Sequence, residues 1–301
     1  MGWRNVMITQ HAKVSYSNRL LLVQTDREKY HVPIADVQLL LVGTTQAVIT
    51  SAAICALAEA HAKVVFTDHQ GEPICETNDY YPTRRTADLV RKQINWPEQR
   101  IQNLWTKNVG SKIQNQIQVI DFSDKNSQPL RDELDKLELN DATNREAVVA
   151  NKYFTLLFGD EFQRRNFDPV NAALNYGYAL ILSLVNREIV MNGYLTCIGI
   201  HHENNENEFN LGSDLMEPFR PVVDQWVSQQ RFNELTPDVK FGLLALLNIV
   251  ITFNGKQTYL SNAISQHVAN SLHFLSEETD EVKIEVELPD EVSSDAINSH
   301  V

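Results

Sequence analysis

Apolar and polar residues alternate with a short period over the first 80 residues of the chain. Short β-prone runs separated by polar turns predict strands over residues 3–8, 13–16, 19–24, 28–33 and 36–42. Ser51 can cap a helix that reaches about residue 61, and residues 63–67 return as a strand. These patterns predict a small β-rich domain that contains one βα element.

The period lengthens after Pro82, where apolar residues begin to recur at helical spacing. The segments with this spacing are residues 84–119, 129–140, 143–158, 168–192, 213–231, 237–252 and 257–275. We therefore predict an α+β fold class with a β-rich domain over residues 1–82 and a helical domain over residues 83–275. Residues 276–301 form a separate tail.

The formal net charge of −13 is concentrated in this tail, which alone carries −8. Blocks of like charge at a terminus are typically solvated, so we expect an appendage. The alternation of Val282, Ile284, Val286 and Leu288 leaves room for one short strand. Because the other 275 residues carry only −5, the overall charge does not exclude nucleic-acid binding.

Residues 84–112 are the most basic stretch, with a local balance of +5 and two interleaved tryptophans, Trp96 and Trp105. Basic side chains neutralise phosphates, and a tryptophan can either stack on an unpaired base or anchor a helix in the core. Core packing is the simpler role for each tryptophan. The candidate DNA-binding residues are Arg84, Arg85, Arg91, Lys92, Lys107, Arg164 and Arg165.

Three cysteines without a close pair predict reduced thiols and a cytoplasmic protein. The longest apolar run, residues 241–253, is shorter than the roughly 20 residues that a bilayer requires, so no membrane partner is expected.

The helix predicted from residue 143 carries an acidic residue on its apolar side. Val149, Tyr153 and Leu157 form one stripe, and Glu146 projects from the same face. A buried carboxylate must be paired, protonated or bound to a cation, because a lone buried ion is unstable. The alternative is an ordinary first-turn acid that the helix dipole favours.

Two adjacent histidines precede a second acidic group. In an extended run, His201 and His202 point to opposite sides, so only one of them can face a given site. If residues 213–217 form a helical turn, Asp214 and Glu217 share a face. Pro218 lacks an N–H group, which predicts that the turn kinks or restarts there.

Acidic residues together with one histidine suit Mg²⁺ or Mn²⁺ better than structural Zn²⁺. In the alternative interpretation, Asp214 is a helix N-terminal acid, Glu217 pairs with Arg220, and His202 is a loop histidine. Spacing alone leaves both interpretations open. Nucleotide-binding and hydrolase motifs are absent from the sequence.

Four motifs in this order resemble the CRISPR-associated spacer-acquisition integrase, in its type II form. They are REAVVANKYF (145–154), NAALNYGY (171–178), GIHH (199–202) and DLMEPFRP (214–221). The strand-rich opening and LVGTT (41–45) are also similar, so the resemblance covers roughly residues 1–275.

The resemblance implies an N-terminal β-sandwich and an all-α C-terminal catalytic domain that holds one Mg²⁺ or Mn²⁺ ion. The implied ligands and catalytic residues are Glu146, His202 and Glu217, with Asp214 as a supporting acid. The implied reaction joins the 3′-hydroxyl ends of a short double-stranded DNA fragment to CRISPR leader-repeat DNA. The implied partners are a second copy of the chain, a dimer of a small ferredoxin-like companion protein, and other type II CRISPR proteins. The family pattern supplies no role for the acidic tail.

Three alternatives stay open at this point. A DNA-binding scaffold would use the basic stretch without catalysis, and a simple metal-dependent nuclease would use water in place of the 3′-hydroxyl. A metalloenzyme that acts on another substrate would have a closed pocket without a basic rim.

Overall fold

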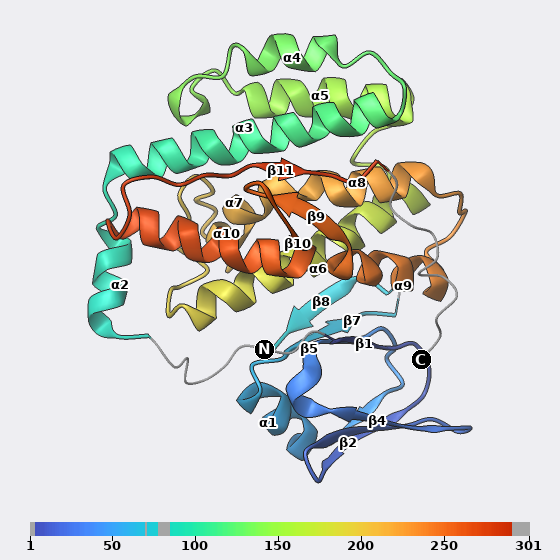
Figure 1. Ribbon diagram of the computed structural model, residues 1–301. Helices are drawn as coiled ribbons and strands as arrows, with labels where there is room; N and C mark the ends of the chain where they lie inside the picture. Colours follow the sequence, from blue (N-terminus) through green and yellow to red (C-terminus); the bar gives the residue numbers. More distant parts are fainter. Residues whose placement is uncertain (1–3, 70, 78–84, 291–301) are drawn as a thin grey trace.

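The N-terminal part consists of two four-stranded sheets (Figure 1). The structure is a computed structural model that describes residues 4–69, 71–77 and 85–290. The first sheet has the order β1(Arg4–Ile8), β5(Val37–Val42), β7(Lys63–Thr67), β8(Pro73–Glu76). The second has the order β4(Lys29–Pro33), β3(Leu20–Gln24), β2(Lys13–Ser17), β6(Val48–Ile49). These strands and helix α1 (Ser51–Glu59) confirm the β-rich opening, and the boundary predicted at residue 82 lies outside the described residues.

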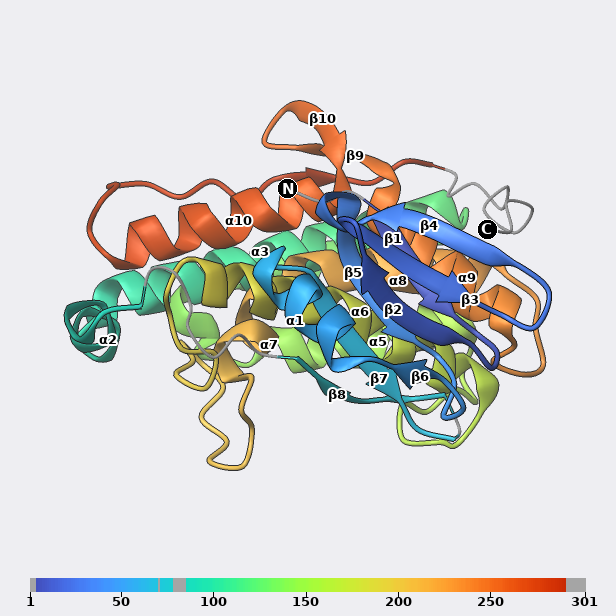
Figure 2. The ribbon, with the colours of Figure 1, turned by 90° about the horizontal axis from the view of Figure 1, so that it is seen from below.

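Strand β5 is buried along its whole length because both of its faces are covered. Leu40 and Val42 lie in the core of the N-terminal part, together with residues of the second sheet and α1. Leu39 and Leu41 belong to the larger core of the helical part. The first sheet therefore joins the two parts, and the view from below in Figure 2 shows the N-terminal strands crossing the helical part.

The remaining described chain is mainly helical. Its helices are α2(Ala87–Ile94), α3(Glu98–Phe122), α4(Gln128–Leu134), α5(Arg145–Phe158), α6(Pro169–Met191), α7(Asn210–Met216), α8(Arg220–Gln229), α9(Pro237–Ala245) and α10(Leu260–Leu275). The single helix expected over residues 84–119 is divided at Pro97, which cannot donate a backbone hydrogen bond. Within the part that the structure describes, no helix is both long and apolar enough to cross a membrane.

The expectation of an all-α C-terminal domain is wrong, because this part contains a small three-stranded sheet. Strands β9 (Val250–Phe253) and β10 (Lys256–Tyr259) form a hairpin where the end of one expected helix, residues 237–252, meets the start of the next, residues 257–275. Asn254 and Gly255 connect them with φ values of 50° and 78°, which suit a tight hairpin turn. The third strand is β11 (Val286–Glu287), so the mixed fold class holds while its helical half is not purely helical.

The acidic C-terminal segment, defined here as residues 276–290, is part of the core and not a solvated appendage. Its four alternating apolar side chains are all buried, at Val282, Ile284, Val286 and Leu288. They pack with the core of the helical part. The short strand β11 lies within residues 282–288, in agreement with the strand that the alternation predicted. The charged side chains between them face outward. The prediction of a solvated tail was wrong because it relied on net charge and did not count these buried apolar residues.

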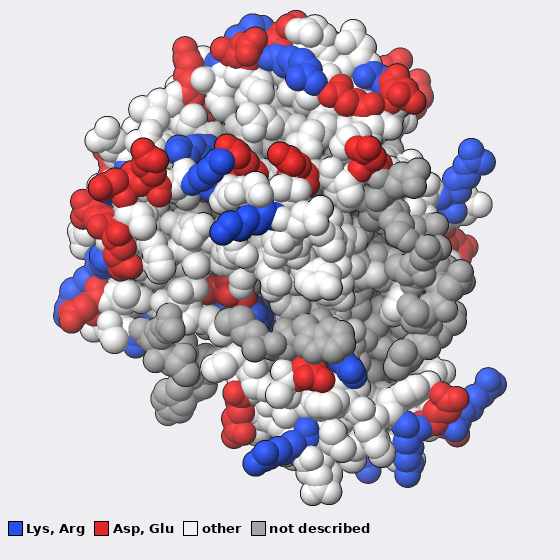
Figure 3. Space-filling model, in the orientation of Figure 1, with Lys and Arg blue, Asp and Glu red and all other residues white. Residues whose placement is uncertain are grey.

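The C-terminal segment also binds the basic stretch of α2 and α3. Lys92 pairs with Glu278 at 3.1 Å, and Arg100 pairs with Asp280 at 3.3 Å. Lys107 donates to the carbonyl of Val282 at 2.6 Å. Figure 3 accordingly shows acidic and basic side chains interspersed on this face of the molecule.

Ile284→Ala should lower the free energy of unfolding by about 3 kcal/mol, because it removes a buried side chain and leaves a cavity. Glu285→Ala is the matched control, since this neighbouring side chain is exposed, and its effect should be within about 0.5 kcal/mol. Urea denaturation measures both. Equal effects of the two substitutions would contradict the packed arrangement.

Candidate metal centre and its surroundings

Glu146 lies in the first turn of α5, where another carboxylate fixes the start of the helix. Asp141 accepts hydrogen bonds from the backbone N–H groups of Arg145 at 2.6 Å and Glu146 at 3.1 Å. This is the capping that a helix N-terminus requires, since its first amides lack partners within the helix. Asp141 was not among the predicted site residues, and it positions Glu146 through the backbone.

Glu217 lies in a short 3₁₀ turn, Glu217–Phe219, between α7 and α8. The break at Pro218 agrees with the predicted kink, and Asn115 of α3 donates to the carbonyl of Pro218 at 2.6 Å. The Glu217 side chain is only 3% exposed, and its Oε1 accepts from Arg220 at 2.8 Å. The Glu217–Arg220 ion pair of the alternative interpretation is therefore present.

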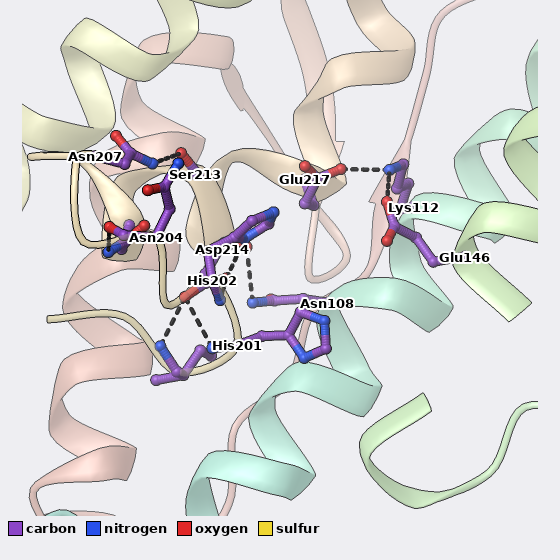
Figure 4. A network of polar contacts seen from close by, with 12 residues as sticks. Asn108, Lys112, Glu146, His201, His202, Asn204, Asn207, Ser213, Asp214 and Glu217 are labelled. Carbon is purple, nitrogen blue, oxygen red and sulfur yellow. Dashed lines mark hydrogen bonds and ion pairs between the residues drawn. The ribbon is translucent and has the colours of Figure 1, made fainter. Parts of the chain in front are cut away.

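Lys112 of α3 joins the two predicted carboxylates (Figure 4). Its Nζ lies 2.5 Å from Glu146 Oε1 and 2.5 Å from Glu217 Oε2. Burial alone would raise the pKa of Glu217, but Arg220 and Lys112 outweigh it and hold this pKa at about 2. Burial tends to lower the pKa of Lys112, and Glu217 and Glu146 raise it above its ordinary value. The Glu217 carboxylate and the Lys112 ammonium are thus both charged at neutral pH.

Asp214 organises the loop that carries the histidines. Its buried carboxylate accepts hydrogen bonds from the backbone N–H groups of Ile200 at 2.7 Å, His201 at 3.1 Å and His202 at 3.1 Å. Gly199 permits this wrapping, since a Cβ at that position would lie 2.7 Å from Asp214 Oδ2 and 2.5 Å from the His202 carbonyl oxygen.

The structure separates the roles of the two histidines. His202 Nδ1 lies 2.6 Å from Asp214 Oδ1, and this hydrogen bond is the main reason why the pKa of His202 is raised above its ordinary value. His201 instead stacks on Trp105, with ring centroids 4.0 Å apart. With Nδ1 engaged by Asp214, Nε2 is the His202 nitrogen left for a ligand or a proton.

The predicted residues therefore form two neighbouring groups. Glu146 and Glu217 meet at Lys112, and His202 pairs with Asp214 beside them (Figure 4). Over the described residues, no three His, Cys, Asp or Glu side chains are placed so that together they could hold a metal ion.

One observation nevertheless fits a cation between the carboxylates. Glu217 Oε2 is buried and accepts no hydrogen bond from the described residues, although it makes the ion pair with Lys112. Glu217 Oε2 and Glu146 Oε1 both contact the same positively charged group, the Lys112 ammonium. Hard carboxylate oxygens of this kind are the ligands that Mg²⁺ and Mn²⁺ prefer.

A buried network lies behind Glu217. The Arg220 guanidinium lies 4.1 Å from the centre of the Tyr178 ring, and the Tyr178 hydroxyl donates to Asp224. Burial raises the pKa of Asp224 to about 6, although Tyr178 and Arg220 act in the opposite direction. This network holds the arginine that pairs with Glu217.

The raised pKa of Asp224 predicts how stability depends on pH. The folded state keeps this proton up to about pH 6, whereas the unfolded chain loses it near pH 4, so stability decreases as the pH rises through this interval. The raised pKa of Asp224 contributes about 3 kcal/mol to this change in the free energy of unfolding. Asp224→Asn should abolish that contribution. Urea denaturation from pH 4 to 7 measures the difference between variant and wild type. Asp88→Asn, at an exposed position, should leave the curve unchanged, and an unaltered slope in Asp224→Asn would contradict the assignment.

Most predicted DNA-binding residues have partners within the chain. Lys92 and Lys107 contact the C-terminal segment, and Arg91 pairs with Asp88 at 2.7 Å. Arg85 donates to the carbonyl of Tyr194 at 3.2 Å, and Arg164 donates to the side chains of Asn171 and Asn175. Arg165 is exposed, and Arg84 lies outside the described residues. Arg85, Arg91, Lys92 and Lys107 are nevertheless exposed, so these contacts offset part of the positive charge without burying it.

Comparisons with known proteins find similarity along almost the whole chain. The sequence profile of the family described as CRISPR associated protein Cas1 matches residues 6–261. The chain is 33% identical to the CRISPR-associated endonuclease Cas1 of Neisseria meningitidis serogroup C (strain 8013) over 297 residues, which cover 96% of this chain and 97% of that protein.

Two solved structures share the fold. One is a casposase bound to integration product, with a TM-score of 0.75 and 19% identity over 94% of this chain and 93% of that chain. The other is a Cas6-RT-Cas1–Cas2 complex, with a TM-score of 0.69 and 17% identity over 91% of this chain and 35% of the longer one. At these identities, the likeness shows a common fold.

Proposed function

Since the chain belongs to the CRISPR-associated Cas1 family, we propose that it is a metal-dependent DNA integrase of CRISPR adaptation. It joins the 3′-hydroxyl ends of a short double-stranded DNA fragment to the CRISPR repeat. The observation that carries this proposal is the meeting of two buried or half-buried carboxylates, Glu146 and Glu217, at one cationic point beside the His202–Asp214 pair.

The reaction is a transesterification. The fragment's 3′-oxygen forms a new bond to the phosphorus of a repeat phosphodiester, and the old P–O bond breaks to leave a 3′-hydroxyl on the repeat strand. One phosphodiester replaces another, so no nucleotide triphosphate is consumed. A Mg²⁺ or Mn²⁺ ion held by Glu146, Glu217 and His202 would stabilise the charge that develops on the phosphoryl oxygens.

Neighbouring residues of the chain orient the three proposed metal ligands. Arg220 keeps Glu217 ionised and oriented, and Asp141 fixes the turn that presents Glu146. Asp214 holds His202 through Nδ1, which leaves Nε2 to bind the ion or to move the proton of the attacking hydroxyl. Asp214 is thus a positioning residue for His202.

The proposed partners follow from the family and from the solved complexes. One similar structure is a complex that contains Cas1 and Cas2, and another is bound to an integration product. We infer that this chain acts as a homodimer together with a dimer of the small companion protein, on fragment DNA and leader-repeat DNA. Arg165, in the loop between α5 and α6, is one of the exposed residues of the candidate DNA-binding set.

The test is an integration assay with supercoiled repeat DNA, pre-processed fragments and the companion protein. Wild type should give joined half-site products, and Glu146→Ala and His202→Ala should abolish joining while preserving DNA binding. Joining retained by either variant would favour a non-catalytic scaffold. Cleavage of the repeat without joining would favour a simple metal-dependent nuclease.

A further inference from the structure

Lys112 occupies the point where the two predicted metal-binding carboxylates meet. Its Nζ lies 2.5 Å from an oxygen of Glu146 and 2.5 Å from an oxygen of Glu217, and the side chain is 7% exposed. A buried ammonium needs such anionic partners. It comes from the middle of α3, which packs against the 3₁₀ turn that carries Glu217.

The charges around this point are already balanced. Two carboxylates, Glu146 and Glu217, face two cations, Lys112 and Arg220. A divalent cation added between the same oxygens would leave an excess of positive charge within a few ångströms, and such repulsion is strong where water is largely excluded. Binding of a divalent ion therefore requires one of the two side-chain cations to move.

Lys112 is the cation that can move. Arg220 is fixed by its bond to Glu217 Oε1 and by the Tyr178 ring beneath its guanidinium. Lys112 has a flexible four-carbon stem, and the contacts of its ammonium within the described residues are to Glu146 and Glu217. Both contacts are ion pairs at 2.5 Å, and Glu217 Oε2 accepts no hydrogen bond from any other described residue, so it is open to a second cation.

We propose that Lys112 is an exchangeable counter-ion of the metal centre, which holds Glu146 and Glu217 together in the metal-free protein and leaves them when a divalent cation binds. This inference rests on the proposed function, because it requires the two carboxylates to be metal ligands. It adds that the metal must compete with a side chain of the protein itself.

The experiment measures Mn²⁺ affinity directly, from the electron paramagnetic resonance signal of free Mn²⁺, without DNA. Lys112→Met should bind Mn²⁺ at least about tenfold more tightly than wild type, since the competing charge is gone. Lys112→Arg keeps the charge and should bind no more tightly than wild type. Lys107→Met is the matched control: it removes the same charge from the same helix, at a lysine that contacts Val282 instead, and should leave the affinity unchanged.

The outcomes separate the two proposals. If Glu146→Ala loses Mn²⁺ binding while Lys112→Met binds no more tightly than wild type, the carboxylates are ligands and the counter-ion proposal is overturned. If wild type binds no Mn²⁺, or if Glu146→Ala binds it as well as wild type, the proposed metal centre is contradicted. The proposed role of Lys112 is then overturned as well.

A second measurement does not depend on the folding of Lys112→Met. The lysine Cε–Hε NMR signals of wild type can be followed during a Mg²⁺ titration, with the Lys112 signal assigned from Lys112→Arg. The Lys112 signal should shift as the site fills, and that of Lys107 should stay in place. A Lys112 signal that is unchanged in the Mg²⁺-saturated protein would overturn the proposal.

Discussion

Glu217→Gln is expected to reduce strand joining at least about 1,000-fold, a loss of the same kind as that expected of Glu146→Ala and His202→Ala. The change keeps the size of the side chain and removes the charge that Arg220 and Lys112 hold in place. An amide oxygen is a weaker ligand for a hard cation than a carboxylate. Gel analysis of integration products measures the loss, and circular dichroism confirms that the variant is folded.

The matched control is Glu281→Gln, the same chemical change at an exposed position of the C-terminal segment. It should join DNA at the wild-type rate. A folded Glu217→Gln variant that joins fragments within tenfold of wild type would contradict the proposal that Glu217 is a metal ligand.

Asp214→Asn should have a large effect on both stability and activity. The carboxylate accepts from three backbone amides and contacts His202 Nδ1, and an amide cannot accept all of these bonds. Donors left without a partner should lower the free energy of unfolding by about 3 kcal/mol. Joining should also fall, because His202 loses the group that orients it.

The titration of His202 distinguishes this role from simple destabilisation. Asp214 raises the pKa of His202, so the pair stabilises the folded state fully below about pH 6.5, and this contribution is lost as the pH rises through the folded-state pKa. In Asp214→Asn, the pKa measured by NMR should return toward its ordinary value. Asp238→Asn, an exposed acid of α9, should leave it unchanged, and an unaltered His202 pKa in Asp214→Asn would refute the pairing.

Local patterns predicted the elements of the β-rich part well. Strands β1 to β5 begin and end within about two residues of their expected positions, because each is a short apolar run bounded by polar turns. The hairpin at Asn254 and Gly255 was missed, although this pair of residues is a strong turn signal. The continuous apolar run before it, residues 241–253, suggested a helix. Such a run can also form a buried strand, and its pattern alone does not distinguish a helix from a strand.

Motif order identified the family correctly, but composition could not show how the basic residues are used. Trp105, Asn108, Lys112 and Asn115 are spaced so that they share one face of α3, which was a signal for a buried polar stripe. Lys112 was instead counted as part of a basic stretch. Its partners lie 34 and 105 residues away along the chain, and only the tertiary fold brings them together.

The packing of the C-terminal segment against α3 has a consequence for biosynthesis. Gln118 of α3 donates to the carbonyl of Val286, a partner 168 residues later in the sequence. Translation proceeds from the N-terminus, so one side of α3 stays uncovered in the nascent chain until the ribosome has passed Leu288. The helix that carries Lys112 therefore reaches its final environment late, and a prematurely terminated product would lack the packing that supports Lys112 and the two carboxylates it joins.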